Sequence, residues 1–254
     1  MALLSTEAIV LSALRYGETS KIVRLATREF GVQSAIARGA LRPRSRFGAA
    51  LQVLSRGQAQ LLPARASDLH QLTAFDLLHL PLVLGGVLER YGAALALAEI
   101  MQRFAPADPH PEIYDALQRG LDQLEASTAA EAGAVGLRAL WQVITLLGFE
   151  PALDQCVLDG RPIDPDAPAA FSIRDGGVLC PECARVHAVS RLEPADRRDL
   201  AALVSPEGRL PTLDARHDTA HRRLLARFVH QQIGEGVELP ALEFWQRRGW
   251  ERDS

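Results

Sequence analysis

The sequence has few cysteines and no long uncharged hydrophobic run, and each shortage excludes a class of protein. Three cysteines in 254 residues, two of them three positions apart, are too few for a disulfide scaffold and favour a reducing compartment. The most apolar stretch, Leu82 to Ile100, is interrupted by Glu89, Arg90 and Glu99, so it is a poor membrane span. The first residues lack the basic start and apolar core of a secretory signal. We therefore expect a cytoplasmic protein that is not bound to a membrane.

Familiar catalytic motifs are also lacking. The sequence has no glycine-rich phosphate loop, no Gly-x-Ser-x-Gly and no His-Glu-x-x-His. His217 and His221 stand four positions apart on a predicted helix, close to Asp214 and Asp218. This spacing is compatible with half of a metal site, or with a solvated helix face near its cap. We expect no enzyme, and a metal-dependent nuclease acting on DNA remains the alternative.

Positive charge is unevenly distributed along the chain. The net charge is −3 and Lys21 is the only lysine, yet residues 1–65 hold ten basic and three acidic side chains. Their balance is +7, which leaves −10 for residues 66–254. A basic first quarter on an acidic remainder predicts a polyanionic partner. The alternative is an ordinary solvated surface.

Four of these basic residues are arginines within the ten residues from Arg38 to Phe47, between two strand-like segments. Gly39 allows close backbone approach, and Pro43 disfavours a helix. Ser45 offers either a hydroxyl contact or a turn cap. The predicted DNA-binding residues are Arg38, Gly39, Arg42, Arg44, Ser45 and Arg46, followed by Lys21 and Arg24. Three further arginines, Arg28, Arg56 and Arg65, are weaker candidates because they can lie on the opposite side of a barrel.

Aromatic side chains for base stacking are scarce in this basic region, which offers only Tyr16, Phe30 and Phe47. For Tyr16 and Phe47 we favour packing in the core over contact with bases. Phosphate contacts are therefore expected to dominate.

Residues 7–75 have the pattern of β structure. Short runs, some with period-two alternation, are separated by turns at Tyr16–Glu18 and Glu29–Gly31. The predicted strands are Glu7–Arg15, Ser20–Thr27, Val32–Arg38, Val53–Leu62 and Leu69–Phe75. Five short strands in so few residues favour a small closed barrel, because closure removes exposed edges.

From Pro81 onward the pattern is mainly helical. Helices are predicted at 82–104, 111–124, 131–148, 194–204 and 214–233, followed by a short apolar terminal piece. Residues 151–190 differ, since they are rich in proline and glycine and hold all three cysteines. We therefore predict an α+β multidomain protein with a barrel at 1–80, a helical domain at 81–150 and 191–254, and a small zinc-ribbon-like insertion at 151–190.

The cysteines suggest a metal site. Cys180 and Cys183 have the spacing of half a zinc ribbon, and Cys156 with Asp159 repeats that spacing with a carboxylate in the second place. His187 is an alternative fourth ligand, since zinc accepts oxygen or imidazole as well as sulfur. Two interpretations stay open: one structural zinc ion, or a ribbon that no longer holds metal.

The N-terminal residues resemble the signature of the RecO family of bacterial DNA repair and recombination mediators. The resemblance is carried by Glu7–Leu11, Tyr16–Glu18, Gly31, Ala37–Ala40, Arg42–Phe47 and Leu51. It implies an oligonucleotide/oligosaccharide-binding (OB) barrel without a catalytic centre. It also implies binding of single- and double-stranded DNA without sequence preference, annealing of complementary strands, and an association with the nucleoid. Its implied partners are RecR and the acidic C-terminal tail of single-stranded DNA-binding protein (SSB), so that RecA can load onto coated strands.

A tail of acidic and apolar residues would need a hydrophobic groove with a positive rim. The row of Arg222, Arg223 and Arg227 beside Leu224, Leu225 and Phe228 is the candidate, although such stripes also arise from a core helix with a solvated face. A zinc-ribbon DNA-binding regulator is a further alternative, and it would require a marked sequence preference.

Overall fold

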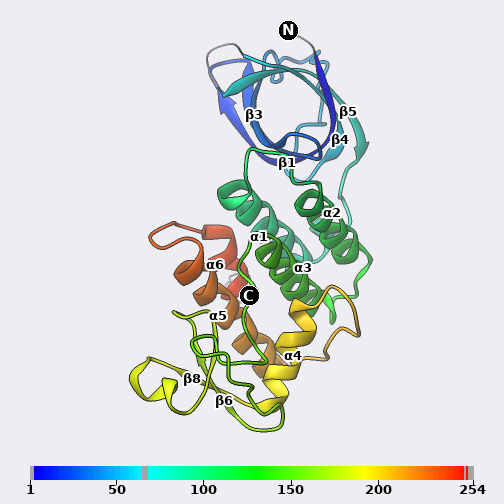
Figure 1. Ribbon diagram of the computed structural model, residues 1–254. Helices are drawn as coiled ribbons and strands as arrows, with labels where there is room; N and C mark the ends of the chain where they lie inside the picture. The colour runs from blue at the N-terminus through cyan, green and yellow to red at the C-terminus, as the bar shows by residue number, and fades with distance from the viewer. Residues whose placement is uncertain (1–2, 65–67, 249, 251–254) are drawn as a thin grey trace. The chain divides into compact units, whose positions relative to one another are not determined.

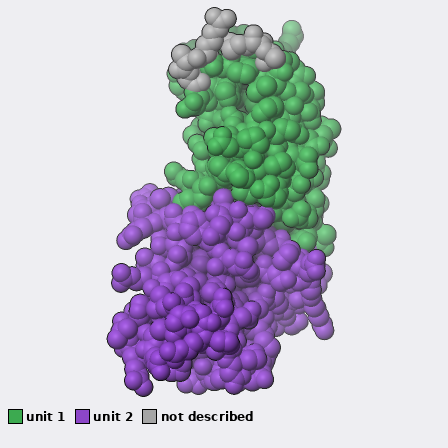
Figure 2. Space-filling view, viewed as in Figure 1, with its two compact units in different colours: residues 1–126 green, residues 127–254 purple. Residues whose placement is uncertain are grey.

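The computed structural model describes residues 3–64, 68–248 and 250. The chain forms two compact units, residues 1–126 and 127–254, which Figure 2 shows in different colours. The first unit holds the whole predicted barrel together with two helices, and the second holds the whole cysteine-bearing insertion. The division into domains at 1–80, 81–150 with 191–254, and 151–190 stays a prediction.

The first unit begins with a closed five-stranded barrel, seen as a ring of strands in Figure 1. The strand order is β1-β2-β3-β5-β4, and β1 pairs with β4 to close the ring. All neighbouring strands are antiparallel except β3 and β5. The strands are β1 (Leu4–Tyr16), β2 (Ser20–Thr27), β3 (Gly31–Ala37), β4 (Arg56–Leu62) and β5 (Leu69–His79). The prediction of a small closed barrel is confirmed.

Alternation along the strands fills the barrel interior, since successive side chains point to opposite faces. On β3, Ala35 and Ala37 belong to the buried core cluster, whereas Ser34 and Ile36 lie on the other face and are half-buried. The small alanines fit a narrow interior, and larger residues of the neighbouring strands, such as Leu25 and Leu61, fill the rest.

Two helices complete the first unit: α1 (Leu88–Phe104) and α2 (Pro111–Ala126). A helix starting directly after Pro81 was predicted, and this is wrong. A short 3₁₀ turn, η1 (Leu84–Gly86), comes first and α1 begins at Leu88, because the paired glycines disfavour a continuous helix. The β2–β3 turn packs against the α1–α2 connection, where Gly31 has φ +67° and a Cβ would lie 2.3 Å from the Asp108 carbonyl oxygen.

The second unit is helical with a small sheet. Its helices are α3 (Ala132–Leu146), α4 (Pro194–Val204), α5 (Ala215–Gln232) and α6 (Pro240–Gln246). The centre of this unit is α3, whose Trp141 ring lies edge-on to Phe228 of α5, with 5.1 Å between the ring centroids. The sheet, in the order β7-β6-β8, consists of β6 (Ala169–Ser172), β7 (Gly177–Leu179) and β8 (Ser190–Leu192). Another 3₁₀ turn, η2 (Cys183–Val186), separates β7 from β8.

None of the helices in the described residues is both long enough and apolar enough to span a membrane.

Candidate functional site

The connection between β3 and β4 is a succession of tight turns. Backbone N–H groups at positions 40, 42, 45, 48 and 50 each donate to a carbonyl three residues earlier. Phe47 and Leu51 turn inward and join the barrel core, where Phe47 is only 2 % exposed. This segment, residues 38–50, is called the cationic turn segment below. The burial of its apolar side chains fixes the course of a chain that has no regular secondary structure.

The arginines of the cationic turn segment point to solvent. The side chains of Arg38, Arg42, Arg44 and Arg46 are all exposed. Within the described residues none of them makes an ion pair with a carboxylate. Arg46 lies over the ring of Phe47, with its guanidinium carbon 5.2 Å from the ring centroid. Four positive charges within one short segment are therefore without an ion-pair partner in the part of the chain that the structure describes.

The other residues predicted for DNA binding support this segment or lie beside it. Gly39 has φ +74°, a conformation that glycine adopts without strain. The hydroxyl of Ser45 accepts the backbone N–H of Phe47 at 3.2 Å, which is a turn-capping role. Lys21 donates to the Leu51 carbonyl at 3.0 Å, so its ammonium group holds the turns against β2. Arg24 is half-buried on the outer face of the barrel.

The weaker candidates among the arginines are engaged with carboxylates. Arg28, in the β2–β3 turn, forms two hydrogen bonds of 3.0 and 3.1 Å with Asp115 on α2. These hydrogen bonds hold the pKa of Asp115 below its ordinary value. Arg56 is buried and pairs with Asp122 and with Glu125, the latter at 2.9 Å. Arg65 lies outside the described residues.

Three arginines of α5 were predicted to form the rim of a partner groove, and for Arg222 this prediction is wrong. Its side chain is 1 % exposed, pairs with Asp218 at 2.8 Å, and lies over the Trp245 ring at 4.3 Å from the centroid. It is a core residue because Asp218, one helical turn away, supplies a buried counter-charge. Arg223 and Arg227 are exposed on α5.

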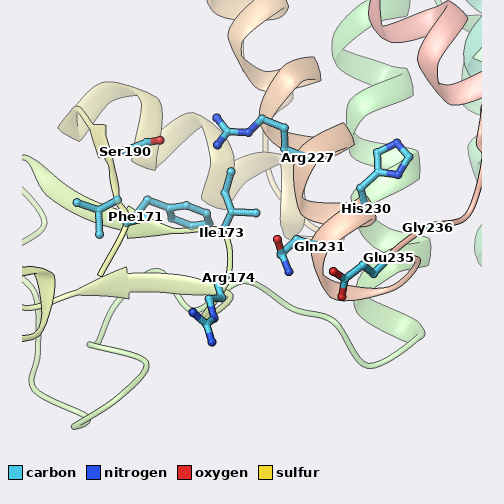
Figure 3. Close-up of a pocket in the computed structure, with 11 residues that line it drawn as sticks. Phe171, Ile173, Arg174, Ser190, Arg227, His230, Gln231, Glu235 and Gly236 are labelled. Atoms are coloured by element: carbon cyan, nitrogen blue, oxygen red, sulfur yellow. The ribbon is translucent and has the colours of Figure 1, made fainter. Parts of the chain in front are cut away.

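Arg227 lines a pocket of about 480 Å³ between α5 and the small sheet (Figure 3). Ile173 and Val189 give the pocket apolar surface, and Arg174 supplies a second positive charge. Phe171 also lines the pocket, although its side chain is only 1 % exposed. The remaining lining residues include His230 and Glu235, so the pocket is not purely basic. Sequence reasoning missed Arg174. No local signal points to it, since more than fifty residues separate it from Arg227.

The structure brings together the four residues predicted as metal ligands. The candidate donor atoms of Cys156, Asp159, Cys180 and Cys183 all lie within 4.8 Å of one another. The Sγ–Oδ2 distances from Cys180 and Cys183 to Asp159 are 3.3 and 3.6 Å. Ligand atoms around a tetrahedral zinc ion are about 3.5–3.8 Å apart. The cluster therefore fits a single metal ion after a small contraction.

The pKa values in this cluster shift in both directions, and hydrogen bonding with Cys180 raises the pKa of Cys183. Hydrogen bonds from Cys156 and from the backbone N–H of Arg161 lower the pKa of Asp159 to about 2. The pKa of Cys156 is lowered overall: burial raises it, but backbone N–H groups, first that of Cys180, outweigh this effect. Arg161 pairs with Asp159 and with Glu182, at 3.2 and 2.6 Å, so it connects the two turns that carry the ligands. His187, the alternative ligand, instead pairs with Asp175 at 2.8 Å.

The histidines considered for a nuclease do not form a cluster of this kind. His217 pairs with Asp214 at 2.8 Å, at the N-terminus of α5. His221 is 3 % exposed, and neither of its ring nitrogens has a hydrogen-bond partner in the described part of the chain. Among the described residues, the cysteine-containing cluster is the only group of three or more possible metal ligands.

The strand order of the barrel, together with the cationic turn segment, defines a protein of the OB-barrel class. Comparison with known protein families identifies the family within this class. Residues 1–81 match the family model "Recombination protein O N terminal", and residues 86–239 match "Recombination protein O C terminal". The chain therefore belongs to the RecO family.

Curated relatives agree with this assignment. The chain is 35 % identical to "DNA repair protein RecO" of Anaeromyxobacter sp. (strain K) over 198 residues, which cover 77 % of this chain and 76 % of that protein. It is 31 % identical to the protein of the same name from Exiguobacterium sibiricum over 232 residues, which cover 88 % and 87 % of the two chains. The protein of that name from Rubrobacter xylanophilus is 33 % identical over 185 residues, 72 % of each chain.

Proposed function

We propose that this protein is a recombination mediator in DNA repair that binds single- and double-stranded DNA without sequence preference. The observation that carries the proposal is the set of four exposed arginines in the cationic turn segment, which make no ion pair with any described residue. Guanidinium groups that contact phosphates release condensed counterions, so the affinity depends on salt and not on base sequence. The family assignment supports a role in repair and recombination.

Annealing of complementary strands follows from the same surface. Two strands repel each other, and a positive surface reduces that repulsion without any chemistry on either strand. We therefore propose a protein without a catalytic centre that works in the cytoplasm on nucleoid DNA. The test is to measure the affinity for several oligonucleotides of unrelated sequence across a range of salt concentrations. Similar affinities with a steep common salt dependence are expected, and a marked sequence preference would contradict the proposal.

We further propose that RecR and the acidic C-terminal tail of SSB are partners, and that with RecR the protein helps RecA to load onto coated strands. The pocket beside Arg227 supports this proposal, because Arg174 and Arg227 line it together with apolar Ile173 and Val189. An acidic tail with apolar residues matches both parts of that lining. In this proposal Arg174 joins Arg227, while Arg222 is left out because it is buried and Arg223 because it does not line the pocket.

Strand annealing on coated oligonucleotides tests the partner site. We expect annealing to be faster when the coating protein carries its tail than when the tail is deleted. Arg227→Ala should abolish that difference. Arg223→Ala is the matched control, since Arg223 is exposed on the same helix but does not line the pocket. If both variants behave like the unmodified protein, the tail binds elsewhere.

We propose that the metal in the cysteine-containing cluster is zinc and that its role is structural. Three sulfur donors favour zinc over hard cations such as magnesium, and the metal would link the two turns of the insertion. Elemental analysis of protein purified without chelator should find stoichiometric zinc. Cys183→Ser should lose the metal and His187→Ala should keep it, because His187 is paired with Asp175 and not with the cluster. Only traces of zinc in the unmodified protein would refute the proposal.

A further inference from the structure

The outer face of the first three barrel strands carries an apolar row that the cationic turn segment does not explain. Leu14 on β1 is paired in register with Ile22 on β2, and Ile22 is paired with Ile36 on β3. A bulge between Val10 and Ser12 shifts the pattern of β1 by one residue, which turns Leu14 outward and Ala13 toward the core. The result is a row of three aliphatic side chains across adjacent strands.

This row is open to solvent at its β1 end. Leu14 is 65 % exposed, while Ile22 and Ile36 are half-buried. Tyr16, two residues beyond Leu14 on the same face, is 55 % exposed. Sequence reasoning placed Tyr16 in the core together with Phe47. The structure confirms this for Phe47 only. Tyr16 is exposed, and the third aromatic of the basic region, Phe30, is half-buried in the β2–β3 turn. We refer to Leu14, Tyr16, Ile22 and Ile36 as the apolar row.

Positive charge lies on both sides of the apolar row. Arg24 of β2 also faces outward, two residues beyond Ile22. Its register partners are Ser12 of β1 and Ser34 of β3. Its Nε atom is shielded from solvent and has no hydrogen-bond partner in the described residues. On the other side, Arg38 follows Ile36 by two positions, which is about 7 Å along an extended chain.

The cationic turn segment is held next to this face. The backbone N–H of Leu41 donates to the carbonyl of Thr19 at 2.8 Å, which ties the segment to the β1–β2 hairpin that carries Tyr16. An apolar strip between cations matches a single strand, whose bases expose flat aromatic faces and whose phosphates are charged. A duplex keeps its bases stacked inside and offers such a surface only phosphates.

From this arrangement we infer that the apolar row is a base-contact surface for single-stranded DNA, with Tyr16 as the stacking platform. This inference rests on the proposed DNA binding and adds a basis for distinguishing single strands from duplexes. Single strands would contact both the arginines and the apolar row, whereas duplexes would contact the arginines alone. OB barrels in general use the face of strands 2 and 3 for oligonucleotides, and the row crosses those two strands.

The test compares affinities for a single-stranded oligonucleotide and its duplex at one salt concentration. Tyr16→Ala should weaken single-strand binding by roughly five- to a hundred-fold, which corresponds to the loss of one stacked base. Duplex affinity and both salt slopes should not change, because no phosphate contact is lost. Tyr16→Phe should restore single-strand binding, since the ring and not the hydroxyl does the stacking. Leu82→Ala is the control for loss of an exposed apolar side chain, as Leu82 is 74 % exposed and lies outside the barrel strands.

A fluorescent base analogue in the oligonucleotide gives a second measurement. Its emission should be quenched on binding to the unmodified protein and to Tyr16→Phe, but much less on binding to Tyr16→Ala. Equal losses for single strands and duplexes, or no loss at all, would overturn the inference while the proposed function stands. Loss of binding to RecR with single-strand affinity intact would also overturn it and make the row a protein interface. If the unmodified protein binds no DNA, the proposed function itself fails.

Discussion

The two ends of strand β3 carry arginines with opposite surroundings. Before the strand, Arg28 in the β2–β3 turn is held by Asp115 of α2. After the strand, Arg38 and its neighbours in the cationic turn segment make no ion pair among the described residues. Seven residues of β3 separate the two ends, a distance of about 20 Å in an extended chain. The acidic helix α2 thus neutralises one end of the barrel and leaves the other end positive.

This difference shows why a count of basic residues overstates the binding surface. Arg28 and Arg56 contribute to the +7 balance of the first 65 residues, but their charges are offset by Asp115, Asp122 and Glu125. The electrostatic attraction for a phosphate backbone is therefore concentrated at one end of the barrel. A compensated arginine stabilises the fold, whereas an uncompensated one is available to a ligand.

The largest expected effect comes from removing the exposed arginines of the cationic turn segment. Arg42, Arg44 and Arg46 replaced together by alanine should weaken duplex binding about 100-fold near 0.15 M salt, if each contacts one phosphate. The slope of log affinity against log salt should become about 2–3 units less steep for the same reason. The measurement is fluorescence anisotropy across a salt series, with circular dichroism to check the fold. Arg28→Ala is the matched control and should bind as the unmodified protein does. Equal affinity of the triple variant and the unmodified protein would falsify the assignment of the site.

A smaller effect, on stability and not on binding, is expected for the buried arginine at the base of β4. Arg56→Ala removes the guanidinium that pairs with Asp122 and with the largely buried Glu125, which among the described residues keeps only the His79 ring at 2.9 Å. The free energy of unfolding should fall by about 2 kcal/mol, the scale of a hydrogen bond between charged groups. Urea unfolding with an unchanged m-value measures this loss. The DNA affinity of the folded variant should not change. A loss of affinity like that of the triple variant would contradict the division of the arginines into paired residues that stabilise the fold and exposed residues that bind DNA.

The smallest effect is expected at the exposed pair of Arg28 and Asp115, and it should depend on pH. Arg28 keeps the pKa of Asp115 below its ordinary value of 3.8, so the pair adds stability above about pH 4. This stability is lost as the pH falls through the lower pKa of the folded state. Asp115→Asn should therefore lower the melting temperature slightly at pH 7, and the difference should vanish near pH 2–3. A constant difference over that range would show that charge is not the cause.

Much of the fold could be predicted from local pattern. Strand β2 and helix α4 have the bounds predicted for them, because turns and prolines mark their ends clearly. The start of α1 was misplaced by several residues, since Pro81 gave a helix-start signal while Gly85 and Gly86 opposed it. The grouping of the four candidate metal ligands was also predictable, because the spacing between Cys180 and Cys183 is a local feature.

Other parts of the site could not be predicted in this way. The sequence alone does not distinguish an arginine that is paired and buried from one that is exposed. Arg222 was therefore assigned to a groove, although its side chain lies in the core. Tyr16 was expected in the core, but the bulge in β1 sets the outward face of that strand end. Arg174 gave no signal, because its neighbour Arg227 is distant in the sequence.

The sequence by itself determined a barrel of alternating strands, a helical remainder, a pair of cysteine-bearing turns and the crowding of arginines before and after Pro43. These are properties of neighbouring residues, and short-range sterics and hydrophobic periodicity fix them. Only the tertiary structure decided which charges are compensated and which apolar side chains stay exposed. Both depend on which distant segment packs against a residue. Carboxylates of α2 pair with Arg28 and Arg56, whereas Arg38 and Tyr16 are exposed to solvent.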